Sequence, residues 1–307
     1  MTEAAAEAVT GDRSWRHRAE RGNVAGIKFM LWLSTAFGRG PARLFVRILA
    51  FYYTLFSRGA RGATRDYLRR VGEDESFGRV YEQILRFSQV TLDSLFLMSG
   101  KIRYFDVTRT GKEHLAELRD TKTGAILLGA HIGSMYAMRA QSGEERLPLY
   151  AVVYTKHAER INAVLRDIDP DGHATLLQMG EGMDFMLRIK ELIEDGAIVA
   201  ILADRVGEKG RAVEADFLGE PARFPAGPYI LASMLKCPVY LTVGLYRDPD
   251  GYDLFCEPFA DQIVLPRKNR DEALAGYVQQ YASRLEHYVK KAPDNWFNFY
   301  EFWEKSA

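Results

Sequence analysis

Short apolar runs alternate with amphipathic segments along most of this chain, and this alternation most constrains its fold. Four of the runs have the length and composition of buried strands: Ala125–Ala130, Leu149–Tyr154, Ala174–Leu177 and Ala197–Leu202. Apolar residues at helical spacing fill Gly182–Asp195. Strands that alternate with crossover helices predict an α/β fold, with a central, mostly parallel sheet flanked by helices.

The rest of the chain continues this pattern. We expect a helix over about Ala158–Asp167 and a short one over Gly227–Leu235. Two strands, Val239–Leu245 and Asp253–Glu257, are predicted to form a hairpin around the Asp248–Gly251 turn. A long final helix is expected over Arg270–Lys291. We see no internal repeat and no linker, which favours one catalytic domain.

The N-terminal part differs from the rest in charge. Over the whole chain, 41 Lys and Arg balance 41 Asp and Glu, which argues against a general nucleic-acid binder. Gly11 to Arg70, however, holds thirteen Lys and Arg against three acids. We predict a tail at residues 1–13, a basic amphipathic helical region at 14–100 and the α/β core at 101–307.

Arginines in this basic region recur at helical spacing. Arg39, Arg43 and Arg47 are spaced by four, and Arg58, Arg61 and Arg65 follow at three and four. Aromatic and aliphatic residues from Leu44 to Phe56 lie between them. A basic stripe beside such an apolar face suits an anionic membrane surface. The alternative is a helical cap packed on the core, with its arginines in water.

Chemically useful side chains follow the ends of the predicted strands, where the sites of α/β sheets gather. His131 follows Ala125–Ala130, and Asp204 with Arg205 follows Ala197–Leu202. Lys156 follows Leu149–Tyr154, and Arg160 lies four residues further on. A histidine, an acid and several cations in one cleft suit transfer to a hydroxyl or an amine, with the histidine taking the acceptor proton. Singly, each of these residues is equally compatible with a structural role.

Two predicted helix starts add backbone N–H groups to this set. One begins at about Ser134, after Gly133, which allows a close backbone approach near His131. The other begins at Gly227, after a predicted loop over Phe217–Pro228 that carries Arg223. N–H groups at a helix start favour a phosphate or an oxyanion.

Several other chemistries lack their sequence signals. There is no Gly-x-Ser-x-Gly elbow and no phosphate-binding Gly-x-x-x-x-Gly-Lys-Ser/Thr loop. Cys237 and Cys256 suggest neither a disulfide framework nor a zinc site. We therefore expect no metal and no cofactor. The sequence contains no run of about eighteen apolar residues, so we predict no transmembrane helix.

Four blocks together resemble the bacterial lipid A biosynthesis (late) acyltransferases of the lysophospholipid acyltransferase superfamily. They are Leu127–Ser134, Leu202–Arg205, Phe217–Pro228 and Pro293–Trp303. Ser14-Trp15 and Arg21-Gly22 are similar to a subgroup of predicted acyltransferases associated with aryl polyene-type clusters. The likeness covers about residues 14 to 303 and implies a single lysophospholipid-acyltransferase-like domain with an N-terminal helical extension.

The resemblance implies a mechanism and one departure from it. In the family, a histidine is followed after four residues by Glu or Asp, which supports the histidine while it deprotonates the acceptor. His131 takes the place of that base, but the acid position falls on Tyr136. A phenol with a pKa near 10 supplies no carboxylate at neutral pH.

Three interpretations of this departure stay open. Asp204 could supply the carboxylate; Tyr136 or a backbone carbonyl could suffice for a slower enzyme; or the chain could be a catalytically impaired lipid- or acyl-carrier-binding protein. The resemblance implies a thioester donor, either acyl carrier protein or coenzyme A, and a lipid or glycolipid acceptor. It also implies a peripheral position on the cytoplasmic face of the bacterial inner membrane.

Overall fold

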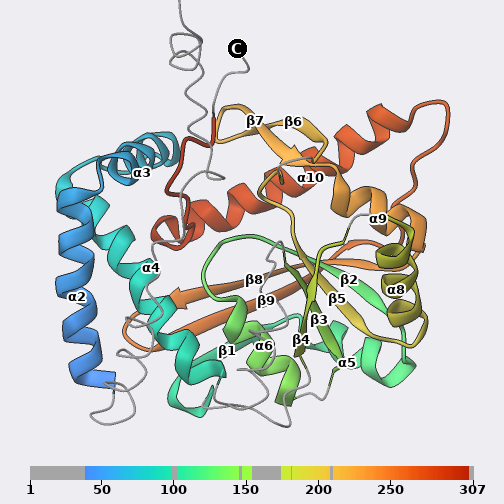
Figure 1. Cartoon of the computed structure of the whole chain (residues 1–307), viewed down its shortest axis with the longest axis horizontal. Coiled ribbons are helices and arrows are strands. Elements are labelled where there is room, and N and C mark those ends of the chain that lie inside the picture. The colour runs from blue at the N-terminus through green and yellow to red at the C-terminus, as the bar shows by residue number, and fades with distance from the viewer. Residues whose placement is uncertain are drawn as a thin grey trace, which may run out of the picture.

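The computed structural model describes residues 39–98, 102–144, 147–153, 174–180, 182–207 and 210–303. A seven-stranded sheet forms its centre, in the order β1-β9-β8-β2-β5-β3-β4 (Figure 1). The strands are β1 (Asp106–Thr110), β2 (Ala125–Gly129), β3 (Leu149–Val153), β4 (Ala174–Gln178), β5 (Ile198–Leu202), β8 (Val239–Arg247) and β9 (Gly251–Ala260). All neighbours are parallel except β8 and β9. The predicted α/β fold with a mostly parallel sheet is confirmed.

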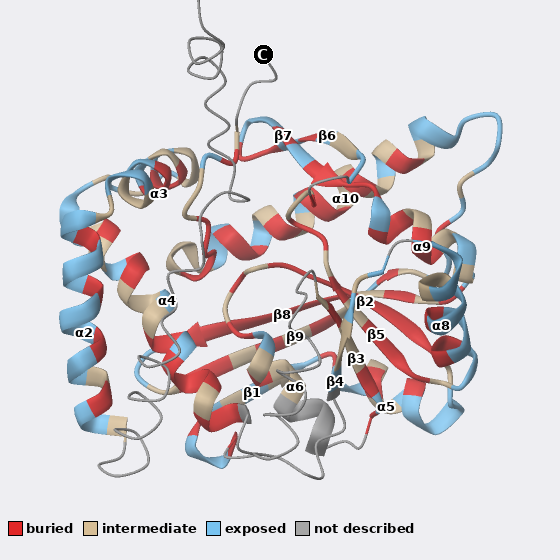
Figure 2. Ribbon diagram, viewed as in Figure 1, coloured by how far each residue is buried: buried red, intermediate tan, exposed pale blue. Residues whose placement is uncertain are grey.

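Helices flank this sheet (Figure 1). They are α5 (Lys112–Thr121), α6 (Met135–Glu144), α8 (Met183–Glu194), α9 (Gly227–Leu235) and α10 (Arg270–Lys291). The central strand β2 is buried at every position, and its neighbour β8 is buried at all but Tyr240 and Arg247 (Figure 2). Continuous apolar runs such as Ala125–Gly129, buried at every position, are what a strand covered on both faces requires.

One predicted loop is instead a hairpin. Strand β6 (Ala212–Phe217) leads into the segment predicted as a loop, Phe217–Pro228, and strand β7 (Glu220–Pro225) lies inside it. The two strands pair antiparallel. The turn residues Leu218 and Gly219 both have positive φ, at 53° and 83°, as hairpin turns matched to the strand twist require. Ala222 and Phe224 are buried while Arg223 between them is exposed. This alternation was hidden among the glycines and prolines of the segment.

In the described part of the chain, the helices α2 (Arg39–Phe56), α3 (Arg58–Val71) and α4 (Phe77–Met98) precede the sheet. Their buried residues Tyr67, Leu68, Val80 and Ile84 belong to the same apolar cluster as the central strands. Ser14-Trp15 and Arg21-Gly22, which carry the subgroup likeness, lie outside the described residues.

The arginines of α2 do not form the single solvent-facing stripe that their spacing predicts. Arg39 binds Asp93 at 2.9 Å, and Arg43 binds Asp250 and the Pro249 carbonyl. Arg47, by contrast, is exposed. Spacing by four aligns residues on one helix face, but it does not show which members find acids on neighbouring elements. Among the described helices, none is long and apolar enough to cross a bilayer.

Candidate active site

The register of two neighbouring strands brings His131 and Asp204 together. Gly129, the last residue of β2, pairs with Leu202, the last residue of β5. His131 lies two residues after Gly129, and Asp204 lies two residues after Leu202. Because the strands are parallel, both segments leave the sheet at the same edge, as expected for the carboxyl ends of an α/β sheet.

His131 and Asp204 form a hydrogen-bonded pair. The ring nitrogen Nδ1 of His131 lies 2.8 Å from Oδ1 of Asp204. Asp204 is buried, whereas the His131 side chain is 34% exposed. Burial opposes ionisation of Asp204, but the charges and hydrogen bonds of His131, with help from Arg205, lower the pKa of this carboxyl to about 2. An ionised carboxylate only accepts, so Nδ1 carries a proton, and in the neutral imidazole the lone pair is on Nε2.

The C-terminal segment fixes this pair from the other side. Oδ2 of Asp204 accepts the backbone N–H of His131 at 3.0 Å and the indole N–H of Trp296 at 3.4 Å. The backbone N–H of Phe297 donates to the His131 carbonyl at 2.9 Å. Trp296 is 1% exposed. The histidine loop and residues 296–297 therefore form one hydrogen-bonded unit around a buried carboxylate.

Gly133 lets the chain turn directly above β8. Its φ is +58°, and a Cβ built on it would lie 1.9 Å from the Gly244 carbonyl oxygen. The N–H groups of Gly133 and Ser134 donate to the Asn295 and Gly244 carbonyls at 2.8 and 2.7 Å. The Ser134 hydroxyl accepts the N–H of Ala137 at 3.1 Å and so caps the start of α6. These two residues have a structural role in holding the turn.

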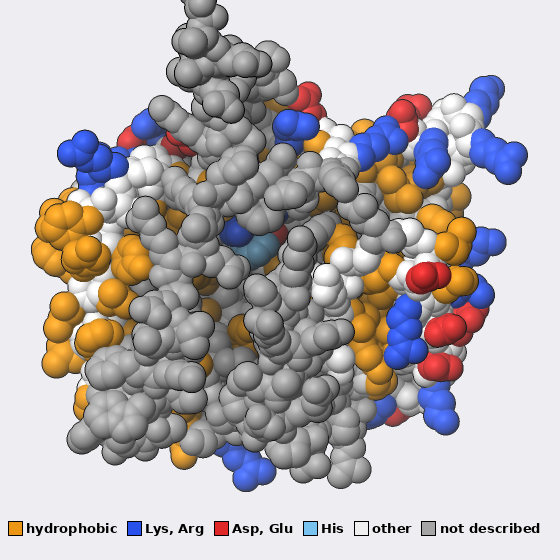
Figure 3. Space-filling view, viewed as in Figure 1, with side chains coloured by type: hydrophobic (Ala, Val, Ile, Leu, Met, Phe, Trp, Pro, Cys, Tyr) orange, Lys and Arg blue, Asp and Glu red, His pale blue; other side chains and the backbone are white. Residues whose placement is uncertain are grey.

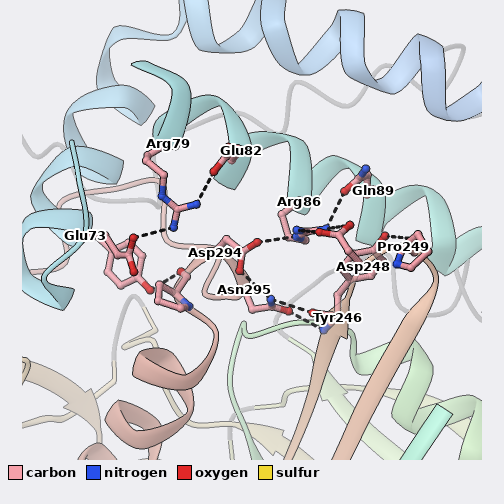
Figure 4. A network of polar contacts seen from close by, with 12 residues as sticks. Glu73, Arg79, Glu82, Arg86, Gln89, Tyr246, Asp248, Pro249, Asp294 and Asn295 are labelled. Carbon is pink, nitrogen blue, oxygen red and sulfur yellow. Dashed lines mark hydrogen bonds and ion pairs between the residues drawn. The ribbon is translucent and has the colours of Figure 1, made fainter. Parts of the chain in front are cut away.

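A polar network ties the same C-terminal segment to α4 and to the β8–β9 turn (Figure 4). Arg86 of α4 donates to Asp294 at 2.8 Å and to Asp248 at 2.7 Å. The Asn295 side chain exchanges hydrogen bonds with the backbone of Tyr246 at 2.7 and 3.2 Å. Gln83 and Tyr67 donate to the carbonyls of Trp296 and Pro293 at 2.8 and 2.5 Å. Trp296 is thus held from the N-terminal helices as well as from the sheet.

Arg205, which directly follows Asp204 in the chain, is a cation close to the histidine loop. It is half-buried, donates to the Phe297 carbonyl at 2.8 Å and lies 5.5 Å from the centre of the Tyr300 ring. The contact with Phe297 places its guanidinium beside the histidine loop. It can therefore act on charge that develops near His131.

Tyr136 lies at the start of α6 and makes no hydrogen bond to His131 within the described part of the chain. It packs against a second apolar cluster that includes Ala42, Val46 and Ala137. Burial raises the pKa of its phenol above 10.0, partly offset by Arg139. The geometry thus gives the carboxylate contact to Asp204 and leaves Tyr136 among packing residues.

Among the described residues, no hydrogen bond or ion pair joins Arg223 or Gly227 to His131. Arg223 is exposed on β7, and Gly227 begins α9. Lys156 and Arg160 lie outside the described residues. Within the described ranges, no group of three or more His, Cys, Asp and Glu could hold a metal ion.

Trp296 is the site contact that the sequence analysis did not identify. The Pro293–Trp303 block was recognised, but no local pattern connects it with a strand end 92 residues earlier. The tight spacing of polar and aromatic residues in that block was the available signal.

Comparison with known protein families gives one match. A sequence model described as "Bacterial lipid A biosynthesis acyltransferase" matches residues 91–305. This range holds β1 to β9 and the His131, Asp204 and Trp296 contacts. A search of curated proteins found no match.

Proposed function

Because the chain belongs to the bacterial lipid A biosynthesis acyltransferase family, we propose that His131 is the general base of its acyl transfer and Asp204 the carboxylate that supports it. Membership makes the protein a transferase of lipid biosynthesis that uses an acyl donor and a lipid acceptor. The hydrogen-bonded His131–Asp204 pair at the joint ends of β2 and β5 carries the proposal.

The proposed reaction uses the free nitrogen of His131. Nε2 takes the proton from a hydroxyl or amine of the acceptor, and the acceptor attacks the acyl carbon of a thioester on acyl carrier protein or coenzyme A. An ester or amide bond forms, the carbon–sulfur bond breaks, and the proton passes from His131 to the leaving thiolate. Asp204 stays ionised and stabilises the imidazolium between these two steps.

Arg205 is our candidate for stabilising negative charge in this reaction. The N–H groups of His131, Gly133 and Ser134 already donate to Asp204, Asn295 and Gly244. They are therefore not free to bind an oxyanion. A guanidinium held beside the loop can bind the developing oxyanion or a donor phosphate. Arg223, Lys156 and Arg160 stay predictions for such contacts.

We place this activity at the cytoplasmic face of the bacterial inner membrane, where the lipid acceptor and a cytoplasmic thioester meet. The link to the aryl polyene-associated subgroup stays a prediction that rests on residues 14–22 of the sequence. The choice between acyl carrier protein and coenzyme A is likewise left to experiment.

Replacement of the motif acid by Tyr136 is the observation that favours a second function, binding of lipid or acyl carrier without catalysis. The Asp204 contact supports the active enzyme instead, because it supplies a buried carboxylate to the same ring. The two functions differ in whether His131 is needed.

The test incubates the purified full chain with labelled acyl thioester and total bacterial lipid extract, with products read by mass spectrometry. We expect a new acylated lipid that disappears with His131→Ala. With Asp204→Asn, its rate of formation should fall by up to about 10⁴-fold, because the amide no longer holds His131 in the tautomer that leaves Nε2 free. No acylated lipid with either donor, or full activity of His131→Ala, would overturn the proposal. Label released as free fatty acid would indicate a thioester hydrolase.

A further inference from the structure

Helix α2 turns an apolar face outward. It buries Ala42, Val46, Ala50 and Thr54 against the rest of the protein. Its exposed large apolar residues are Leu44, Phe45, Ile48, Leu49, Phe51, Tyr52, Tyr53, Leu55 and Phe56. Figure 3 shows hydrophobic side chains gathered on this flank of the molecule. Soluble monomers rarely leave so many large apolar side chains together in water, and such a patch marks an interaction site.

The charge around this face has one sign. Residues 39 to 65 contain six arginines and no acid. Arg39 and Arg43 are held by Asp93 and Asp250, and Arg61 donates to the Thr54 carbonyl at the end of α2. Arg47, Arg58 and Arg65 are exposed, and none of the three forms an ion pair with an acid in the described ranges. The outward surface therefore combines aromatic side chains with exposed arginines.

We infer that α2 is an interfacial helix that lies on an anionic lipid bilayer and inserts the residues around Ile48, Tyr52 and Phe56. This inference rests on the proposed function, since it names the surface from which the lipid acceptor comes. Apolar residues on one face and exposed arginines beside them are what partial insertion below anionic headgroups requires. A protein partner would have to match both the aromatic surface and its positive rim.

Aromatic contacts join α2 to one end of α4, and a second group of aromatic contacts lies further along α4, beside the histidine loop. Phe51 of α2 contacts Phe77 and Tyr81 of α4, with ring centres 6.0 and 6.2 Å apart. About three helical turns further along α4, or about 15 Å, the exposed Phe87 contacts Phe297 and Phe299, each at 5.3 Å. Phe297 donates its N–H to His131.

With α2 on the bilayer, these two groups of aromatic contacts lie along a lateral route by which a lipid reaches the site. The acyl chains of the acceptor can stay in apolar surroundings while its headgroup moves to His131. An acceptor with a hydrophobic anchor is therefore favoured over a fully soluble one.

The experiment measures flotation of the full chain with vesicles of phosphatidylcholine, with and without phosphatidylglycerol. We expect binding to the anionic vesicles that weakens with salt. The triple variant Ile48→Asp, Tyr52→Asp, Phe56→Asp should lose at least tenfold in binding; these residues are 56–64% exposed. The matched control Met183→Asp, Leu187→Asp, Met234→Asp lies on α8 and α9 at 50–71% exposure and should bind as the unmodified chain.

Two further measurements separate the outcomes. Arg47→Glu, Arg58→Glu, Arg65→Glu should remove the preference for phosphatidylglycerol. His131→Ala should float like the unmodified chain, so failure of catalysis does not affect this test. Equal flotation of the α2 variant, with unchanged thermal unfolding, would overturn the inference. So would a dimer in light scattering that the α2 variant converts to a monomer, because α2 would then cover a second copy.

Discussion

Asp204 acts as a fixed charge and does not titrate in the working range. Its pKa of about 2 lies below the usual value of 3.8, because His131 and Arg205 outweigh the cost of burial. The carboxylate therefore stabilises the fold above about pH 4, and that contribution is lost as the pH falls toward 2. At neutral pH it orients the His131 ring and balances its positive charge.

The sequence marked His131 and Asp204 as candidates, and their pairing was one of three interpretations that it left open. Both residues follow buried strands, and both lie in blocks that resemble the acyltransferase family. Their contact depends on β2 and β5 being neighbours in the sheet, although β3 and β4 lie between them in the chain. Strand order is set by packing of the whole sheet, which no local pattern encodes. The same reason hid the contact of Trp296 with Asp204.

Trp296 is expected to be a positioning residue. Trp296→Phe keeps a large ring but removes the N–H that donates to Oδ2 of Asp204. A hydrogen bond of this kind contributes about 1 kcal/mol net, so we expect kcat to fall about fivefold with KM nearly unchanged. Trp303→Phe is the matched control, because its indole donates to the Phe217 carbonyl and not to Asp204. Steady-state kinetics of both variants decide this; equal kcat values would leave Trp296 a packing residue.

Helices and strands with strong periodicity were predicted closely. The helices Gly227–Leu235 and Arg270–Lys291 begin and end where we expected them. Strand β1 was missed because it is an edge strand, polar on one face, whose place depends on pairing with β9. The β6–β7 hairpin was missed because the prolines and glycines of this segment indicated a loop, although buried and exposed residues alternate along β7. Edge and surface strands are specified by their partners more than by their own composition.

Arg86 links α4, the β8–β9 turn and the C-terminal segment, so its removal should destabilise all three. Arg86→Met leaves the carboxylates of Asp248 and Asp294 without the cation they share. The arginine side chain is mostly buried, and we expect a loss of about 2 kcal/mol in the free energy of unfolding. The hydrogen bond from Arg86 lowers the pKa of Asp248, despite partial burial. The loss should therefore be full at neutral pH and shrink below about pH 4 as that carboxyl becomes protonated.

Arg69→Met is the control for that measurement. Arg69 also pairs with a carboxylate, Glu75, but both side chains are exposed, and exposed pairs contribute little. Thermal unfolding from pH 3 to 8 compares the two variants. Equal melting temperatures for Arg86→Met and the unmodified chain would show that the network does not stabilise the fold.

The N-terminal helices and the sheet share one core, although the family match begins only at residue 91, inside α4. Tyr67 packs against Trp296 with ring centres 5.1 Å apart, and Gln83 donates to the Trp296 carbonyl. The residues that position the buried carboxylate therefore come from both sides of the match boundary. Helix α2, which carries the exposed apolar face, packs against α4, which supports Trp296. The proposed lipid-binding face and the His131–Asp204 pair are therefore linked through α4.

A fragment of residues 91–307 should consequently fail to fold, even though it holds the matched family region. It lacks Tyr67, Leu68, Val80 and Ile84, which the whole chain buries in its main cluster. Each such side chain contributes about 1.5–3 kcal/mol on burial, so the sum of about 6–12 kcal/mol approaches the entire stability of a typical domain. We expect the intact chain to unfold cooperatively with a near-ultraviolet circular dichroism signal from its tryptophans, and the fragment to show neither. A fragment that melts cooperatively and still transfers acyl groups would mean that residues 91–307 form a self-sufficient core and that the helices before residue 91 are needed only for membrane binding.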